Sequence, residues 1–359
     1  MMNKLIACLS IRTGKSIMTT STSSNYIQFK IHNDVERYSW ATYCLFSILS
    51  SFIGDTLILM ASFQKDAFKV NKIIVTIIQH IAVSDLATAI CYLLPASTSL
   101  LANSWVLGDP VCLLLVYTMY MVYPAGMSLI AVLTTAKFLI LRYPLRAASW
   151  SRKRAHLVCS IFWAFSLIVN LILILVIDAD DVQFDYKIYT CEYNFTAEVW
   201  RKILPVTGFI FGLAPNIIIV ATTVPTLKYL AHARTSARRV RGCVSWKGAL
   251  TVALTAVIYF ISTFPYTIYL IVYGFMKEHE PHWFRFHFFR ISYILLAINI
   301  VANFYIYTLT IKSFRRYLLS KVLSVVSVFR QNSRILAPTS GKFYQNFHPG
   351  SIGTLHKRI

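Results

Sequence analysis

The sequence predicts an all-α membrane protein, a seven-transmembrane helix bundle with a short amphipathic helix after the seventh span. Three observations support this fold class. Hydrophobic residues make up 57% of the 359 positions and charged residues only 14%, whereas a soluble domain usually carries about 25% charged residues. The apolar residues gather in seven long runs, and the sign of the charge alternates between successive connections.

Each apolar run is long enough to cross a bilayer as a helix, which takes roughly 20 residues. An unpaired backbone group in lipid costs several kcal/mol, so a spanning run must be helical. A transmembrane barrel would need alternating segments of about ten residues, and that pattern is absent. A large soluble helical bundle is the weaker alternative. The runs are approximately Ser39–Ser62, Ile73–Leu94, Pro110–Leu141, Ala155–Ile177, Ile203–Leu230, Gly248–Phe275 and Phe288–Ile311.

The net charge of +21 comes from basic residues in alternate connections. They follow the first run, separate the third from the fourth and the fifth from the sixth, and continue after the seventh. Of the 14 acids, all but Asp55, Asp66 and Asp85 fall on the opposite side. The positive-inside rule therefore puts the N-terminus outside the cell. The basic excess is a topology signal with a secondary attraction to anionic membrane lipid, and it does not indicate nucleic-acid binding.

These signals divide a plasma-membrane protein into four parts: an extracellular tail (1–38), the seven-transmembrane bundle (39–311), an amphipathic cytoplasmic helix (312–320) and a disordered cytoplasmic tail (321–359). The first residues lack a convincing cleavage site. The N-terminal tail is therefore either uncleaved or an extension upstream of a start at Met18. The last part carries several serines and threonines, and their phosphorylation would favour arrestin docking.

Of the seven cysteines, two stand out at the outer ends of the predicted bundle, in the oxidising compartment where disulfides persist. Cys112 opens the third run, and Cys191 lies in the acidic connection between the fourth and fifth runs. Either the two form a disulfide that holds this connection over the bundle, or they are free thiols. The sequon that begins at Asn194 lies in the same connection and is a candidate glycosylation site.

Short motifs occur in order on the successive runs. They are Gly54-Asp55, Ser84-Asp85-Leu86-Ala87, Trp105 before Cys112, Tyr143-Pro144-Leu145-Arg146, Trp163, Pro215, Pro265, Asn299 with Asn303 and Tyr307, and finally Phe314-Arg315-Arg316-Tyr317. Together, over roughly Trp40–Leu318, they resemble the rhodopsin-like family of G-protein-coupled receptors, of which the chain looks like a divergent orphan member.

Four switch positions depart from the family pattern. Ala136-Lys137-Phe138 stands where the family has Asp-Arg-Tyr, and Phe304 replaces the proline of Asn-Pro-x-x-Tyr. Ser262-Thr263-Phe264-Pro265 replaces Cys-Trp-x-Pro, and Thr223 replaces a tyrosine of the fifth helix. A non-signalling decoy, or a partner in receptor heteromers, is therefore the alternative to a working receptor.

The resemblance implies that a heterotrimeric G protein contacts the inner ends of the third and seventh helices, through Lys137, Phe138, Arg142 and Tyr307. Because Ala136 replaces the neighbouring acid, no local ion pair can hold Lys137 in the resting state. A lysine is also a point donor and lacks the planar fork of arginine. We expect raised basal coupling or weakened coupling. The alternative is that Lys137 is one more positive-inside residue.

Asp55 and Asp85 are carboxylates inside predicted membrane helices, where ionisable groups are rare and usually functional. In the family, the counterpart of Asp85 binds sodium, and Asn299 and Asn303 are retained here. Because Asp55 adds a second acid, we expect the pair to share a proton and sodium sensitivity to be weak. The main alternative is that the two acids have only a structural role, in a hydrogen-bond network with Asn303. A further alternative is that the protein conducts protons or ions through Asp55 and Asp85. No cofactor or metal cluster is indicated.

The outer halves of the third, sixth and seventh helices present aromatic side chains at helical spacing. Met119 stands where amine receptors carry an aspartate, and Ala297 where opsins carry the retinal lysine. We therefore expect neither a buried counter-ion for an amine nor bound retinal. Plain packing is the alternative to ligand contact for the candidate residues, which are Met119, Tyr120, Tyr123, Tyr266, Tyr269, Phe289 and Tyr293.

The sequence thus predicts a non-enzymatic receptor that transduces binding of an extracellular ligand to heterotrimeric G proteins, with arrestin as a second cytoplasmic partner. Four aspartates between positions 178 and 185 would attract a basic ligand, so a cationic or amidated peptide is the first hypothesis. The alternative is that these aspartates bind no ligand, and that the outer connection is solvated and acidic because the topology requires it.

Overall fold

The computed structural model describes residues 34–64, 67–68, 71–176, 182–186, 188–193, 198–236, 246–275 and 287–336. The chain divides into a compact unit, Met1–Arg315, and a second unit, Arg316–Ile359. Within the described residues, seven helices are long and apolar enough to cross a membrane, and all lie in the first unit. The predicted seven-helix bundle is confirmed.

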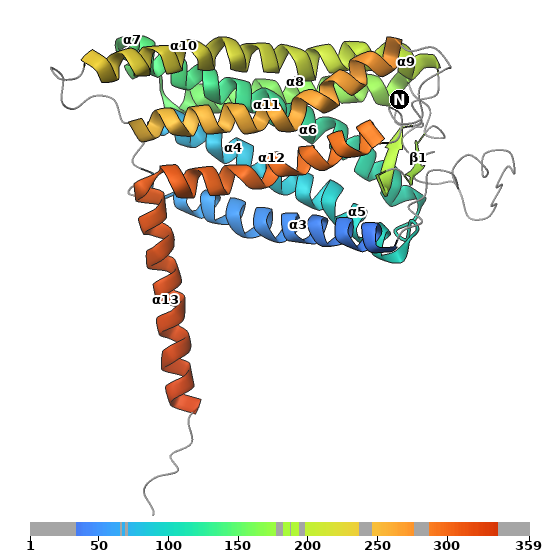
Figure 1. Cartoon of the computed structure of the whole chain (residues 1–359), viewed down its shortest axis with the longest axis horizontal. Helices are drawn as coiled ribbons and strands as arrows, with labels where there is room; N and C mark the ends of the chain where they lie inside the picture. Colours follow the sequence, from blue (N-terminus) through green and yellow to red (C-terminus); the bar gives the residue numbers. More distant parts are fainter. Residues whose placement is uncertain are drawn as a thin grey trace, which may run out of the picture. The chain divides into compact units, whose positions relative to one another are not determined.

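The described residues are almost all helical, and the two strands among them are β1 and β2 (Figure 1). The first half contains α3 (Asp34–Ser62), α4 (Lys72–Thr88), the π segment η1 (Ala89–Leu93), α5 (Leu94–Ala102), α6 (Asp109–Arg142), α7 (Pro144–Ala148) and α8 (Arg152–Val176). The second half contains β1 (Val182–Asp185), β2 (Thr190–Tyr193), α9 (Glu198–Thr207), the π segment η3 (Gly208–Leu213), α10 (Ala214–Ser236), α11 (Trp246–Phe275), α12 (Phe289–Thr310) and α13 (Lys312–Leu336).

The second and fifth spans each contain a π turn just before a proline. Leu94 donates its backbone N–H to Ala89, five residues back, and Pro95 follows. Ala214 donates likewise to Phe209, and Pro215 follows. Proline has no N–H and its ring clashes with the preceding turn, and the wider π turn absorbs this mismatch without ending the helix. The second span therefore continues to Ala102, past the expected end at Leu94.

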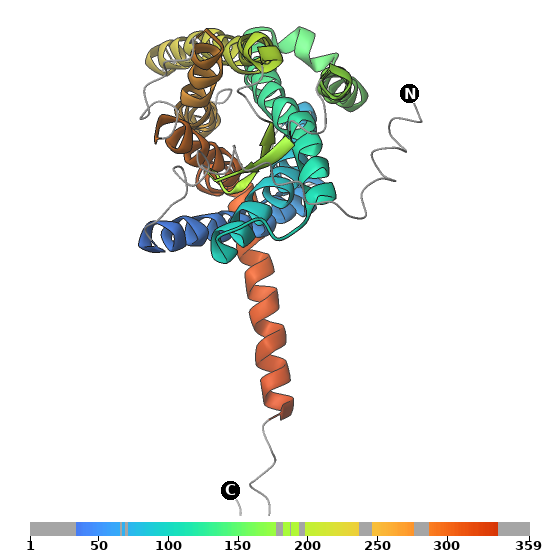
Figure 2. The ribbon, with the colours of Figure 1, turned by 90° about the vertical axis from the view of Figure 1, so that its right-hand side faces the viewer.

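Helix α6 has the central place in the bundle, because it packs against α4, α8 and α10. Helix α12 completes the ring between α11 and α3, and Figure 2 shows the helices from the end where β1 and β2 lie. Helix α8 contacts only one side of the bundle and leaves Ile161, Ile168 and Leu175 at least 55% exposed. Apolar side chains exposed on this scale require lipid around them.

The two ends of this unit are distinct (Figure 1). The hairpin of β1 and β2 lies at one end, which we call the hairpin end, and α7 lies at the other, the α7 end. At the hairpin end, buried Arg37 of α3 donates a 2.7 Å hydrogen bond to the Leu100 carbonyl of α5. Arg290 of α12 pairs with Glu36 of α3. These contacts hold three spans together at that end.

Helix α13 begins where Phe314, fully buried, stacks on Phe68 at 4.9 Å between ring centroids. The helix continues to Leu336, past the expected end at residue 320. The reason is local, because no glycine or proline occurs between Lys312 and Leu336 and Pro338 is the first residue that disfavours continuation. Residues 321–336, expected as part of a disordered tail, are thus helical, and 337–359 lie outside the described residues.

Candidate functional site

The connection between the fourth and fifth spans forms an antiparallel hairpin at the hairpin end of the bundle (Figure 2). Residues Val182–Asp185 pair with Thr190–Tyr193, with Phe184 opposite Cys191. Cys191 forms a disulfide with Cys112 of α6, 79 residues away, a crosslink that stabilises by about 4 kcal/mol on loop entropy. The predicted disulfide is confirmed, and it fixes β2 against the outer turn of the third span.

Below the hairpin lies a small cavity of about 50 Å³. Its walls come from η1, α6, β2, α11 and α12, so segments far apart in sequence meet there. Most of the lining is aromatic or acidic, and it consists of Tyr92, Val116, Met119, Tyr120, Tyr123, Pro124, Cys191, Glu192, Tyr266 and Tyr293. A space of this size holds a few waters or one compact polar group.

Glu192 is the acid of this cavity, and it is buried, with only 4% exposed. The hydroxyl of Tyr120 donates to Oε1 at 2.8 Å, and the hydroxyl of Tyr293 donates to Oε2 at 2.7 Å. The backbone N–H of Tyr193 donates to Oε1 at 3.2 Å. Burial raises the pKa of the Glu192 carboxyl to about 7, and the tyrosine hydroxyls oppose a larger rise.

Aromatic rings surround this carboxylate on several sides. Tyr293 stands edge-on to Tyr92 at 5.0 Å and to Tyr266 at 5.2 Å between centroids. The hydroxyl of Tyr123 is buried and has no hydrogen-bond partner among the described residues. A carboxylate in a cavity lined by tyrosine rings is suited to a cation, because the acid supplies a counter-charge and the faces of such rings attract positive charge.

Five of the seven candidate ligand residues line this cavity, namely Met119, Tyr120, Tyr123, Tyr266 and Tyr293. Tyr269 and Phe289 do not line it. They are fully buried and pack on each other at 4.5 Å between centroids, in the aromatic cluster that includes Tyr266 and Tyr293. The expectation that Met119 leaves the site without a buried acid is wrong, because Glu192 reaches the cavity from the hairpin. Its place directly after Cys191, the residue tied to α6, is the signal that could have revealed it.

A second polar group lies deeper in the bundle, between α3, α4 and α12. Asn303 donates to Asp85 Oδ2 at 2.8 Å, and Ser51 donates to Asp55 Oδ2 at 2.6 Å. Both carboxylates are buried, and they are close enough to interact electrostatically. Asn299 is half-buried and makes no side-chain hydrogen bond within the described part of the chain. Asp85 and Asn303 are thus hydrogen-bonded to each other, Asp55 interacts with Asp85 electrostatically, and Asn299 stays outside the hydrogen bonds.

The chain is similar to known membrane receptors. A family model described as 7 transmembrane receptor (rhodopsin family) matches residues 54–307. The chain belongs to the rhodopsin family of seven-transmembrane receptors. C-X-C chemokine receptor type 2 of Oryctolagus cuniculus is 23% identical over 242 residues, which are 66% of this chain and 63% of that protein. The match therefore covers less than two thirds of that relative's length. The family is one of multi-pass membrane receptors and not of enzymes.

The altered helix-seven motif of this receptor has a packing reason. Phe304, at the position of the family's proline, lies directly against Gly54 of α3. A Cβ at Gly54 would lie 2.6 Å from Phe304 Cγ, so only glycine fits there. On another side Phe304 stands edge-on to Phe314 at 6.3 Å between centroids. The aromatic ring therefore ties α3, α12 and the start of α13 together.

At the α7 end, the receptor buries an amino group that has no counter-charge among the described residues. Lys137 Nζ of α6 is buried and has no hydrogen-bond partner among the described residues. Phe138 is half-buried, whereas Arg142 is exposed and lies over the ring of Tyr143 at 5.6 Å. The Tyr307 hydroxyl of α12 is also buried and unpartnered in the described part of the chain. These four predicted coupling residues lie on α6 and α12.

Some predicted features lie outside the described residues. They are the sequon residue Asn194 and three of the aspartates of the outer connection, Asp178, Asp180 and Asp181.

Proposed function

We propose that this receptor transduces binding of an extracellular cationic ligand at the tyrosine-lined cavity to heterotrimeric G proteins. The observation that carries the proposal is the position of Glu192, a buried carboxylate in a cavity whose other polar groups are tyrosines. A buried acid is costly to keep without a counter-charge. A cation bound beside Glu192 would offset that cost.

The hairpin end faces the outside of the cell in this proposal. Five basic residues lie at or near the α7 end with no acid between positions 142 and 154, and they are Arg142, Arg146, Arg152, Lys153 and Arg154. Basic connections of this kind stay cytoplasmic. The disulfide of the hairpin supports the same orientation, because disulfides persist in oxidising compartments. We place the receptor in the plasma membrane with an extracellular N-terminal tail.

The ligand we favour is a basic peptide that inserts one ammonium or guanidinium group. The cavity of about 50 Å³ is too small for a whole peptide or drug-sized molecule but large enough for such a group. The rest of the ligand would lie above it, near Asp185 of the hairpin. The similarity to a protein named as a chemokine receptor supports the general role of a receptor for an external signal.

Coupling would take place at the α7 end. Lys137, Phe138, Arg142 and Tyr307 are proposed to contact the G protein, and α7 adds Leu145, whose side chain is 89% exposed. An apolar side chain that projects from a basic segment suits a partner surface with an apolar pocket and acidic surroundings. Arrestin is proposed as the second partner, recruited by phosphorylation of the C-terminal region.

A paired peptide screen would test the proposal. Cells expressing the full chain are exposed to a library of short arginine-containing peptides and to counterparts with alanine at each arginine, with G-protein activation and arrestin recruitment as readouts. We expect active peptides to lose potency when one particular arginine is replaced. Glu192→Gln keeps the shape of the side chain, and it should lower the potency of the active peptide by roughly 30-fold or more, because it leaves a buried cation unpaired.

Asp109→Asn is the matched control, because Asp109 is an exposed acid at the start of α6 that does not line the cavity. It should change potency by less than about threefold. Equal losses in the two variants would contradict a specific cation site. Nucleotide exchange on purified G proteins separates a working receptor from a decoy, since peptide binding without exchange would overturn the proposed coupling and leave the cation site standing.

A further inference from the structure

A second pocket lies at the α7 end, on the side of the bundle where α4, α6 and α7 meet. It has a volume of about 240 Å³ and is separate from the tyrosine-lined cavity. Its lining consists of Ile73, Ala136, Leu139, Ile140, Tyr143, Arg146, Ala147 and Trp150. None of these side chains is an acid, and one of them is a cation.

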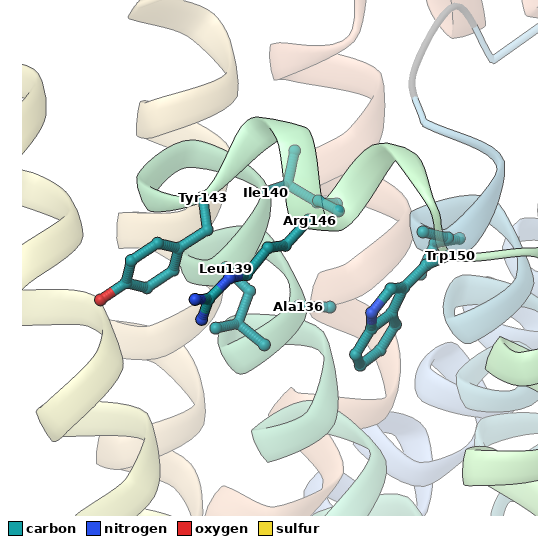
Figure 3. A pocket seen from close by; sticks show the side chains of 8 residues that line it. Ala136, Leu139, Ile140, Tyr143, Arg146 and Trp150 are labelled. Carbon is teal, nitrogen blue, oxygen red and sulfur yellow. The ribbon is translucent and has the colours of Figure 1, made fainter.

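The pocket has an apolar floor and a polar rim (Figure 3). Ala136, Leu139 and Ile140 come from the last turns of the third span. The guanidinium of Arg146 reaches back toward Tyr143 and Leu139, and the indole of Trp150 lies on the other side of Ala136. The Arg146 guanidinium lies 5.7 Å from the centre of the Tyr143 ring. It makes no ion pair among the described residues.

The surroundings of the pocket are strongly basic. Residues 142–154 contain five cations and no acid. Of these five, Arg152 donates to Gln79 Oε1 at 3.1 Å, and all are exposed. An anion near this segment would meet no like charge from the segment itself, and the planar guanidinium of Arg146 could hold a phosphate or carboxylate through two hydrogen bonds.

The position of the pocket relative to the membrane indicates which kind of molecule covers its apolar floor. Helix α6 ends at Arg142 and α8 begins at Arg152, so the basic rim lies where two membrane spans end. Tyrosine and tryptophan favour this interfacial depth. The floor is one or two turns further into the span, so in a bilayer it would lie at the level of the lipid chains. A volume of 240 Å³ is too small for a helix of a partner protein, whose diameter is about 10 Å, but it accepts part of a lipid chain.

We propose that this pocket binds an anionic phospholipid, with the headgroup on Arg146 and the upper part of an acyl chain over Leu139 and Ile140. The cytoplasmic leaflet is the one rich in anionic lipid, so the assignment rests on the orientation given under the proposed function. Because the bound lipid would touch both α6 and α7, it would brace the segment that carries exposed Leu145 against the third span.

Native mass spectrometry of the purified full chain tests this site. The receptor in detergent is mixed with dioleoyl phosphatidylserine or dioleoyl phosphatidylcholine, and the bound lipids are counted. We expect phosphatidylserine to be preferred. Arg146→Gln should lower its binding by about fivefold, whereas Lys153→Gln, an exposed neighbour outside the pocket, should lower it by less than about twofold. Trp150→Ala should weaken both lipids, because it removes a wall of the pocket and leaves the headgroup contact.

The same experiment can overturn the proposal. Equal losses in Arg146→Gln and Lys153→Gln would show a diffuse basic surface and not a site. Equal binding of the two lipids would remove the role of the headgroup. Displacement of phosphatidylserine by inorganic phosphate alone would assign the site to a free anion. Because lipid binding is measured without peptide or G protein, a failure here is independent of a failure of the proposed signalling.

Discussion

Glu192 at the hairpin end and Lys137 at the α7 end each bury a charged group, and the surroundings of these two groups differ. At the hairpin end, Glu192 receives hydrogen bonds from two tyrosine hydroxyls and one backbone N–H. At the α7 end, Lys137 Nζ is buried with no partner among the described residues. A buried charged group without partners costs several kcal/mol more than a well-bonded one.

This difference suggests that the two ends have different roles in signalling. The hairpin end is preorganised, since a disulfide and a hydrogen-bonded acid hold the cavity in shape. The α7 end is incomplete, and an acidic group from a partner could satisfy Lys137. We infer that the hairpin end selects the ligand and that the α7 end is the part whose state is shifted. Three changes would break or sharpen this comparison.

The largest effect is expected from pH at the hairpin end. Because burial raises the pKa of Glu192 to about 7, the carboxylate is mostly charged at about pH 8 and mostly neutral at about pH 6. The potency of an arginine peptide, whose guanidinium stays charged throughout, should therefore fall about tenfold as the pH is lowered across this range. Dose–response curves on intact cells measure the change. A curve that is equally pH-dependent in Glu192→Gln would exclude this carboxylate as the titrating group.

A smaller effect is expected when the α7 end is given the acid that it lacks. Ala136→Asp places a carboxylate beside Lys137, so it should stabilise the resting state and lower ligand-independent G-protein activation by about fivefold, equivalent to one partly buried ion pair. Ala136→Asn is the neutral control of the same size and should leave basal activity near that of the wild type. If the two variants behave alike, the unpaired lysine does not set the resting state.

The smallest effect concerns the polar group between the two ends. Asp55 and Asp85 lie close together in the bundle, each with one hydrogen-bond donor, and we expect them to share a proton that keeps sodium out. Peptide affinity of the wild type should therefore respond little to sodium, and Asp55→Asn should introduce a response of about two- to fivefold. Competition binding with and without sodium measures it. A variant as insensitive as the wild type would remove the shared-proton explanation.

Much of the fold follows from local features of the chain. Each span was predicted from its length and apolar character. The disulfide between Cys112 and Cys191 was predicted from their place on one side of the membrane. The errors were at helix ends. The second span was expected to end near Pro95 and instead continues to Ala102, because a π turn compensates for the missing N–H. Whether a proline ends a helix depends on such backbone adjustments, which no residue pattern revealed.

The candidate site was predictable only in part. Met119, Tyr120, Tyr123, Tyr266 and Tyr293 were found because a helical period shows which side chains share a face. Glu192 was missed, since a strand residue in a long connection has no periodic relation to the helices. Its position depends on a disulfide across 79 residues and on tyrosines from α6 and α12.

The sequence by itself determined that seven helices cross a membrane and which connections share a side, because bilayer thickness and charge placement act on each segment separately. Only the tertiary structure decided which charges are buried and with what partners. It brought Glu192 under the hairpin among the tyrosines, left Lys137 unpaired among the described residues, and formed the Arg146 pocket. Such contacts join residues far apart in the chain, and their energies depend on geometry that exists only once the helices have packed.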